Sequence, residues 1–204
     1  MVSMNFLSID CSTNIGSLFI KNQNKTFIKV LQNDKSNIDL LMKKILDFCE
    51  ESGLKIQNIS NIFVNQGPGS FSGLRSSLAV AKGISLAQNV NIFGYNTFIW
   101  VASKFFDKEN FIYSLIKIRD KYFIKEFNKK LITISKFREM QKYEIIKKFS
   151  NKFLIIPENI SSTYDEKILK LNNLKIVDLD HNNLEFLQKK GLLDKHLIKP
   201  IYIG

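Results

Sequence analysis

The segment from Ile62 to Gln88 constrains the fold more than any other part of the chain. Its first residues, 62–66, predict a short buried strand, and a glycine-rich turn separates that strand from a helix expected over 72–88. Only Arg75 and Lys82 are charged in this helix, and many of its other residues are small. A helix with so few charges must be covered on most sides, and small side chains let a neighbour approach its backbone. The segment therefore predicts an α/β fold.

The remaining periodicity predicts two α/β lobes, one over residues 1–106 and a shorter one over 107–204. In the first lobe we expect strands at 5–10, 17–21, 25–31, 62–66 and 91–95, with helices from about Asn37 to Gly53, over 72–88 and from Thr97 to Phe106. In the second lobe we expect strands at 111–118, 121–128, 153–156 and 175–178, with helices over 135–150, 165–171 and 184–190 and an irregular tail at 199–204. The second half repeats the first loosely, which indicates duplicated lobes.

The bulk composition indicates a globular chain. Of its 204 residues 45% are hydrophobic, and no apolar run reaches the ~18 residues that span a bilayer. The first residues lack the basic start of a secretory signal, and Cys11 and Cys49 have no metal-like spacing. We therefore expect a cytoplasmic protein with two reduced thiols and no membrane association.

The net charge of +11 invites a nucleic-acid interpretation. However, 27 of the 30 basic residues are Lys and only three are Arg, the residue best suited to bidentate phosphate and base contacts. Residues 101–204 carry most of the excess charge. The charge alone leaves direct RNA contact as a minority hypothesis.

A first candidate site is the turn Asp10-Cys11-Ser12-Thr13 at the end of the first strand. A carboxylate followed by hydroxyl residues suits a phosphate or magnesium-phosphate group, with Asp10, Ser12 and Thr13 as the binding residues. The alternative is that Asp10 accepts hydrogen bonds from the amides of its own turn, as Asp often does.

A second candidate is the turn before the charge-poor helix. Backbone amides at a helix N-terminus bind anions, but the segment has neither the Walker lysine nor the dinucleotide fingerprint. Its glycines can equally serve tight backbone geometry. The segment consists of Gly67, Pro68, Gly69, Ser70, Phe71, Ser72, Gly73, Leu74 and Arg75.

This nine-residue string resembles the signature of the TsaB (YeaZ) family, with Ser72 in place of the usual threonine. The opening Asp10-Cys11-Ser12-Thr13 is similar to the family's Asp-Thr-Ser-Thr, and Pro200-Ile201-Tyr202 is similar to its Pro-Val-Tyr ending. The chain departs from the family at Lys35, where a histidine often precedes the serine, and at 119–122. The resemblance is strong over about the first 100 residues and faint afterwards.

The resemblance implies the duplicated actin-like/sugar-kinase (ASKHA) architecture, with mixed central sheets and flanking helices. It implies a non-catalytic subunit that activates a TsaD-like enzyme, which transfers threonylcarbamoyl to the adenosine beside the anticodon of tRNA. A TsaE-like ATPase assists, and tRNA is reached through the complex. No cofactor is expected to bind tightly, a nucleotide is expected only in the complex, and the free chain is a candidate homodimer.

The residues independently favour a non-catalytic chain. His181 and His196 lack ligand partners at metal spacing, so we expect both on the surface and no metal site. No nucleophile elbow is present, and Trp100 is expected in the core.

The charge-poor helix and the first helix provide the candidate partner interface. Its predicted residues are Ser76, Leu78, Ala79 and Lys82, together with Met42 and Ile45. The alternative is a helix enclosed between its own sheet and the second lobe. For function, the rivals are an ATP-dependent kinase of the same superfamily, a peptidase and a stand-alone RNA-binding module. The kinase would need phosphate and adenosine glycines in the second lobe, where glycine is scarce.

Overall fold

The computed structural model describes residues 4–32 and 39–202. These residues form two compact units, one drawn from Met1–Asn96 and Leu193–Gly204 and the other from Thr97–Leu192. The expected division after Phe106 differs from this one at both ends of the second unit. Helix α4 (Thr97–Ala102) joins the second unit because it packs on that unit's sheet, whereas the C-terminal segment returns to the first unit.

The first unit is built on a five-stranded mixed sheet. Strand β1 pairs antiparallel with β2 and parallel with β4, and the strand order is β3-β2-β1-β4-β5. The strands are β1 (Phe6–Asp10), β2 (Ile15–Asn22), β3 (Lys25–Gln32), β4 (Asn61–Asn65) and β5 (Asn91–Tyr95). All five predicted strands are therefore present, with small shifts at their ends.

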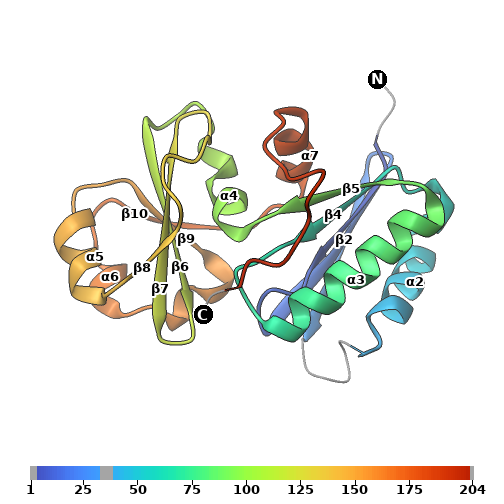
Figure 1. Ribbon diagram of the computed structural model, residues 1–204, viewed down its shortest axis with the longest axis horizontal. Helices are drawn as coiled ribbons and strands as arrows, with labels where there is room; N and C mark the ends of the chain where they lie inside the picture. Colours follow the sequence, from blue (N-terminus) through green and yellow to red (C-terminus); the bar gives the residue numbers. More distant parts are fainter. Residues whose placement is uncertain (1–3, 33–38, 203–204) are drawn as a thin grey trace. The chain divides into compact units, whose positions relative to one another are not determined.

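The two faces of this sheet bury different side chains. Because side chains alternate along a strand, Phe6 and Phe63 share one face, where their rings meet at a centroid distance of 4.9 Å. The intervening aliphatic residues point to the other face, which α2 (Leu41–Glu51), the 3₁₀ helix η1 (Ile56–Asn58) and α3 (Phe71–Gln88) cover. Figure 1 shows α2 and α3 side by side on this face. The start expected for the first helix, Asn37, lies outside the described residues.

The second unit repeats this topology strand for strand. Its sheet has the order β10-β9-β6-β7-β8, and the central strand again pairs antiparallel with its hairpin partner and parallel with the crossover strand. The strands are β6 (Phe111–Ile118), β7 (Lys121–Asn128), β8 (Arg138–Met140), β9 (Leu154–Pro157) and β10 (Leu174–Val177). The predicted duplication of α/β lobes is confirmed.

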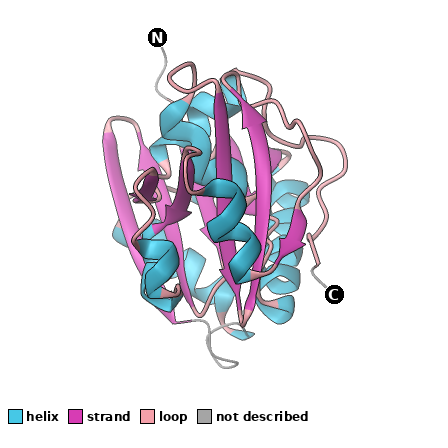
Figure 2. Cartoon of the chain, turned by 90° about the vertical axis from the view of Figure 1, so that its left-hand side faces the viewer, coloured by secondary structure: helices cyan, strands magenta, loops and turns pink. Residues whose placement is uncertain are grey.

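Helices cover both faces of the second sheet. In Figure 1, α5 (Lys142–Phe149) and α6 (Glu166–Leu169) lie on one side of it and α4 on the other. Figure 2, viewed from the side of α5 and α6, shows helices in front of these strands. The remaining helical elements are η2 (Ser103–Phe105), η3 (Glu158–Thr163) and α7 (Asn182–Lys189). No helix among the described residues is both long and apolar enough to cross a bilayer.

The helix expected over 135–150 is wrong in its first half. Residues 138–140 form β8, which pairs with β7 and brings Met140 opposite Tyr122. The helix begins only at Lys142, where Gln141 and Glu144 form a capping box that fixes its start. The hydrogen bonds of an edge strand therefore outweigh the helical periodicity of these residues.

Candidate functional site

The Asp10 carboxylate is turned into the protein at the end of β1. Its Oδ1 accepts hydrogen bonds from the Ser12 amide at 2.9 Å and from Asn65 Nδ2 at 3.0 Å. Only 3% of Asp10 is exposed, and this burial raises its pKa, although the bonds from Ser12 and Asn65 act in the opposite direction. The Thr13 hydroxyl donates to the Ile15 carbonyl at 2.6 Å. Asp10 therefore holds its own turn together, as the structural alternative proposed.

The glycine-rich loop packs directly on that turn. A Cβ atom at Gly69 would lie 2.0 Å from the Ser12 carbonyl oxygen, and one at Gly73 would lie 2.1 Å from the Cys11 oxygen. The Ser70 amide donates to the Ser12 carbonyl at 2.7 Å. These two glycines are required because the two backbones touch.

Several of the amides that an anion could use are bound within the chain. Gly67, at a φ of 102°, donates to Asn65 Oδ1 at 2.8 Å, and the Gly73 amide donates to the Ser70 hydroxyl at the start of α3. The Ser12 and Ser70 amides are engaged as described above. The two predicted anion sites thus lie against each other, and four of their amides have partners within the chain, which favours a structural role for the signature loop.

The C-terminal segment completes this arrangement. The Ile201 amide donates to the Gln66 carbonyl at 2.7 Å, and Gln66 Nε2 donates to the Lys199 carbonyl at 3.0 Å. Ile198 is buried in the core of the first unit, and the Tyr202 ring packs on Phe71 with centroids 5.0 Å apart. Sequence reasoning missed this return. The available signal was the apolar character of the tail, in which Leu197, Ile198 and Ile201 stand close together.

The outer face of α3 is exposed and carries no acidic residue. From Phe71 the exposed positions recur at helical spacing through Arg75, Ala79, Lys82 and Leu86. Phe71 is 56% exposed and Leu86 is 84% exposed, and the Arg75 guanidinium lies 4.9 Å from the centroid of the Phe71 ring. This stripe therefore combines two large apolar side chains with two positively charged ones.

An apolar groove of about 380 Å³ runs beside this stripe, between α3, α2 and η1. A Cβ atom at Gly83 would meet nothing within 4 Å, so the α3 backbone is open to an approaching element there. The exposed side chain of Met42 borders the groove from α2. The groove is lined by Met42, Ile56, Ala79, Val80, Gly83, Ile84, Ala87 and Gln88.

The predicted interface residues divide between two environments. Met42, Ala79 and Lys82 are exposed, and Ser76 is half-buried on the same helix. Ile45 and Leu78 are instead 0% and 3% exposed, because they pack on the sheet with the rest of the core. The expectation that these two line a partner contact is corrected. Sequence reasoning passed over Leu46 and Leu86, which are exposed and apolar.

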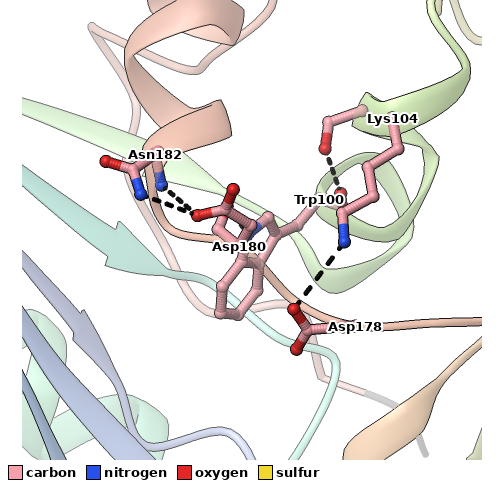
Figure 3. Close-up of polar contacts among 6 residues, drawn as sticks. Trp100, Lys104, Asp178, Asp180 and Asn182 are labelled. Carbon is pink, nitrogen blue, oxygen red and sulfur yellow. Dashed lines mark hydrogen bonds and ion pairs between the residues drawn. The ribbon is translucent and has the colours of Figure 1, made fainter.

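The histidine expectation is half wrong. His196 is exposed, but His181 is 2% exposed, and burial lowers its pKa to about 3. Its ring lies 4.7 Å from that of Trp100, which is buried as predicted. Trp100 Nε1 donates to the Asp180 carbonyl at 2.9 Å, while the Asp180 carboxylate accepts two bonds from Asn182, as Figure 3 shows.

This cluster serves the packing of the second unit. In Figure 3 the Lys104 ammonium reaches toward Asp178, with an N–O distance of 3.7 Å, and so links η2 to the segment before α7. Among the described residues no group of three His, Cys, Asp or Glu side chains has the arrangement of a metal site. Burial also raises the pKa of the Cys11 thiol to about 12 and that of Cys49 to about 11.

Comparison with known proteins gives matches over both the whole chain and its first half. The TsaD family model, described as tRNA N6-adenosine threonylcarbamoyltransferase, matches residues 33–114. A protein from Buchnera aphidicola, named tRNA threonylcarbamoyladenosine biosynthesis protein TsaB, is 26% identical over 97% of each chain. The Escherichia coli protein of the same name is 24% identical over 48% of this chain and 43% of that protein.

Solved structures show the same fold. YeaZ from Pseudomonas aeruginosa has a TM-score of 0.73 at 14% identity, covering 98% of this chain and 100% of that one. The ethanolamine utilization protein EutJ from Carboxydothermus hydrogenoformans has a TM-score of 0.51 at 8% identity, covering 94% and 90%. The duplicated actin-like/sugar-kinase architecture implied by the resemblance is confirmed. Together with the signature loop, the match over 97% of the chain shows that the chain is similar to proteins of the TsaB (YeaZ) family.

Proposed function

We propose that this chain is a non-catalytic subunit in the formation of threonylcarbamoyladenosine in tRNA, where it binds and activates a TsaD-like transferase. The names of its relatives support the pathway. The observation that carries the subunit role is the exposed apolar face of α3 with its adjoining groove. The non-catalytic role is supported by four amides of the two candidate phosphate sites that are bound within the chain, those of Ser12, Gly67, Ser70 and Gly73.

The partner-binding surface that we propose consists of the α3 stripe and the groove, and its centre is open. Gly83 has empty space above it and Ala79 is exposed, so a partner helix can approach the α3 backbone closely. Exposed Met42 and Leu46 on α2 and Leu86 on α3 supply larger apolar side chains around this centre. Small residues flanked by large apolar ones are suited to helix-on-helix packing.

Further members of the assembly follow from the same proposal. The transferase brings in a TsaE-like ATPase and tRNA, and any nucleotide binds only in the complex, in the cytoplasm. Without its partner the chain would pair with a second copy through the same face, because that pairing covers the same apolar surface.

The experiment is capture of the TsaD-like subunit by the Ala79→Glu variant. A carboxylate buried without a partner in the interface costs several kcal/mol, so affinity should fall at least a hundredfold. Asn24→Glu, at the exposed β2–β3 turn, adds the same charge elsewhere and should bind like the wild type. Both variants should keep the wild-type circular dichroism spectrum. Unchanged capture by a folded Ala79→Glu variant would place the contact elsewhere.

A further inference from the structure

A second surface, on the second unit, holds lysine side chains around two phenylalanine rings. The Phe106 and Phe186 rings meet edge to face at a centroid distance of 5.1 Å. The Lys130 ammonium lies 5.2 Å from the Phe106 centroid, and the Lys190 ammonium lies 5.4 Å from the same point. Lys190 also lies 5.7 Å from the centroid of Phe186. Two cations from distant parts of the sequence thus share one ring.

The backbone holds these segments together. The Asp107 amide donates to the Lys129 carbonyl at 2.7 Å, which joins the end of η2 to the turn after β7. Lys190 follows α7, whose residue Phe186 provides the ring contact. The lysines are therefore placed by ordered elements of one unit.

The surface has more positive charge than its carboxylates neutralise. Lys130 pairs with the Asp107 carboxylate, and Lys129 and Lys190 act on the same group, which lowers its pKa. Lys189 is paired with Glu185 at 2.6 Å. Lys108 and Glu109 add one charge of each sign beside them. The full set is five lysines, Lys108, Lys129, Lys130, Lys189 and Lys190, with three carboxylates, Asp107, Glu109 and Glu185.

Aromatic rings hold ammonium groups without neutralising them. The ring contacts therefore orient Lys190 and leave its charge available to an anion, whereas Lys130 also pairs with the Asp107 carboxylate. The exposed cations come from separated segments, 129–130 and 190, so they suit a chain of phosphates rather than a single small anion.

We infer that the lysine surface around Phe106 and Phe186 contacts the phosphate backbone of RNA. It lies outside the α3 face, so it adds a direct RNA contact to a chain for which tRNA was expected only through the complex. This inference rests on the proposed function only in its choice of tRNA as the RNA that is bound. Capture of the TsaD-like subunit should not change when this surface is altered, and that measurement separates the two proposals.

The test measures binding of the full chain to a fluorescently labelled, unmodified tRNA transcript by anisotropy across a salt series. The variant is Lys129→Gln with Lys190→Gln, which removes two exposed charges and keeps the Lys130–Asp107 pair. The control is Lys147→Gln with Lys175→Gln, two exposed lysines of the same unit on α5 and β10. Both variants change the net charge equally.

We expect the Lys129/Lys190 variant to bind tRNA at least tenfold more weakly and to lower the magnitude of the log–log salt slope by about 1 to 2, since each phosphate contact contributes about 0.7 to 0.9. The control should change affinity less than threefold. Absence of tRNA binding by the wild type at low salt would overturn the inference. So would equal losses in the two variants, or an equal loss of polyglutamate binding, which would indicate a surface for acidic polymers in general.

Discussion

Gly69 lies so close to Ser12 that a Cβ atom at position 69 would be 2.0 Å from the Ser12 carbonyl oxygen. No side chain can be accommodated at that distance unless the backbone moves. At Gly83, in the middle of α3, the added Cβ atom would meet nothing within 4 Å. The two glycines therefore serve different purposes, and the first is fixed by the fold itself.

Alanine at these two positions should change stability in opposite directions. We expect Gly69→Ala to lower the free energy of unfolding by about 1–3 kcal/mol, as overpacking does. Gly83→Ala should raise it by about 0.5–1 kcal/mol, because glycine is a poor helix former. The urea unfolding midpoints of both variants check this. The prediction applies to the monomer at low protein concentration, and a destabilised Gly83→Ala variant there would mean that the space above α3 is filled within the single chain.

The strands and helices of the first unit were predicted well because the apolar residues of each element recur at the spacing that its secondary structure requires. Strands β1 and β4 coincide with short apolar runs, and a glycine-rich turn marks the boundary between β4 and α3. Met140 shows where this fails: a three-residue edge strand has too few residues for a period of two to be recognised. Its pairing with β7 is a tertiary effect.

The candidate site was predicted in its residue types but not in its geometry. The Asp10 turn and the loop at Gly69 were both recognised, yet their mutual contact depends on the β1–β4 pairing and could not be read from either motif. Likewise, helical spacing placed Leu78 and Ala79 on the same helix, but only packing decided that Leu78 faces the sheet. The burial of His181 depends on contacts with Trp100, distant in sequence.

The isolated chain should hydrolyse no ATP above background. The amides of Ser12, Gly67, Ser70 and Gly73 already have partners within the chain, which leaves the two candidate phosphate sites without these donors. Phosphate release in the presence of magnesium is the measurement. Turnover of about 1 per second, the lower end of ordinary enzyme rates, would contradict the proposal if Asp10→Asn abolished it.

His181 should make the protein less stable in mild acid. Its pKa is about 3 in the folded state against an ordinary 6.5, so only the unfolded chain binds this proton between those values. The neutral imidazole therefore favours folding fully above pH 6.5, and that contribution is lost as the pH falls toward 3. Each pH unit within the window costs up to about 1.4 kcal/mol.

The comparison that isolates this effect uses His181→Gln and His196→Gln. Between pH 6 and 5, His181→Gln should lose about 1 kcal/mol less of its free energy of unfolding than the wild type does, whatever its absolute stability. His196→Gln should follow the wild type, since that side chain is exposed. Parallel pH profiles for wild type and His181→Gln would show that this histidine is not buried in solution.

Both thiols should resist alkylation while the protein is folded. Burial holds the pKa of Cys11 at about 12, with a smaller contribution from the Asp10 charge, and that of Cys49 at about 11, also through burial. At pH 8 little thiolate is present, and the side chains are 1% and 3% exposed. Mass spectrometry after iodoacetamide should find neither modified until urea is added. Rapid labelling of Cys11 in the folded chain would mean that the Asp10 turn opens.

The C-terminal segment should stabilise the first unit through one side chain. Ile198 is 5% exposed and packs in the same core as Leu7 and Val64, so Ile198→Ala should lower the free energy of unfolding by about 2–4 kcal/mol. The neighbouring Leu197 is 69% exposed. Leu197→Ala should therefore change the free energy of unfolding by less than about 0.5 kcal/mol. The two variants remove side chains of the same size from adjacent positions. A difference between their urea unfolding midpoints therefore reports the burial of Ile198 rather than the loss of an aliphatic side chain as such. Equal, small effects would show that the segment does not return to the first unit in solution, and the contacts of Gln66 with Lys199 and Ile201 would then be absent as well.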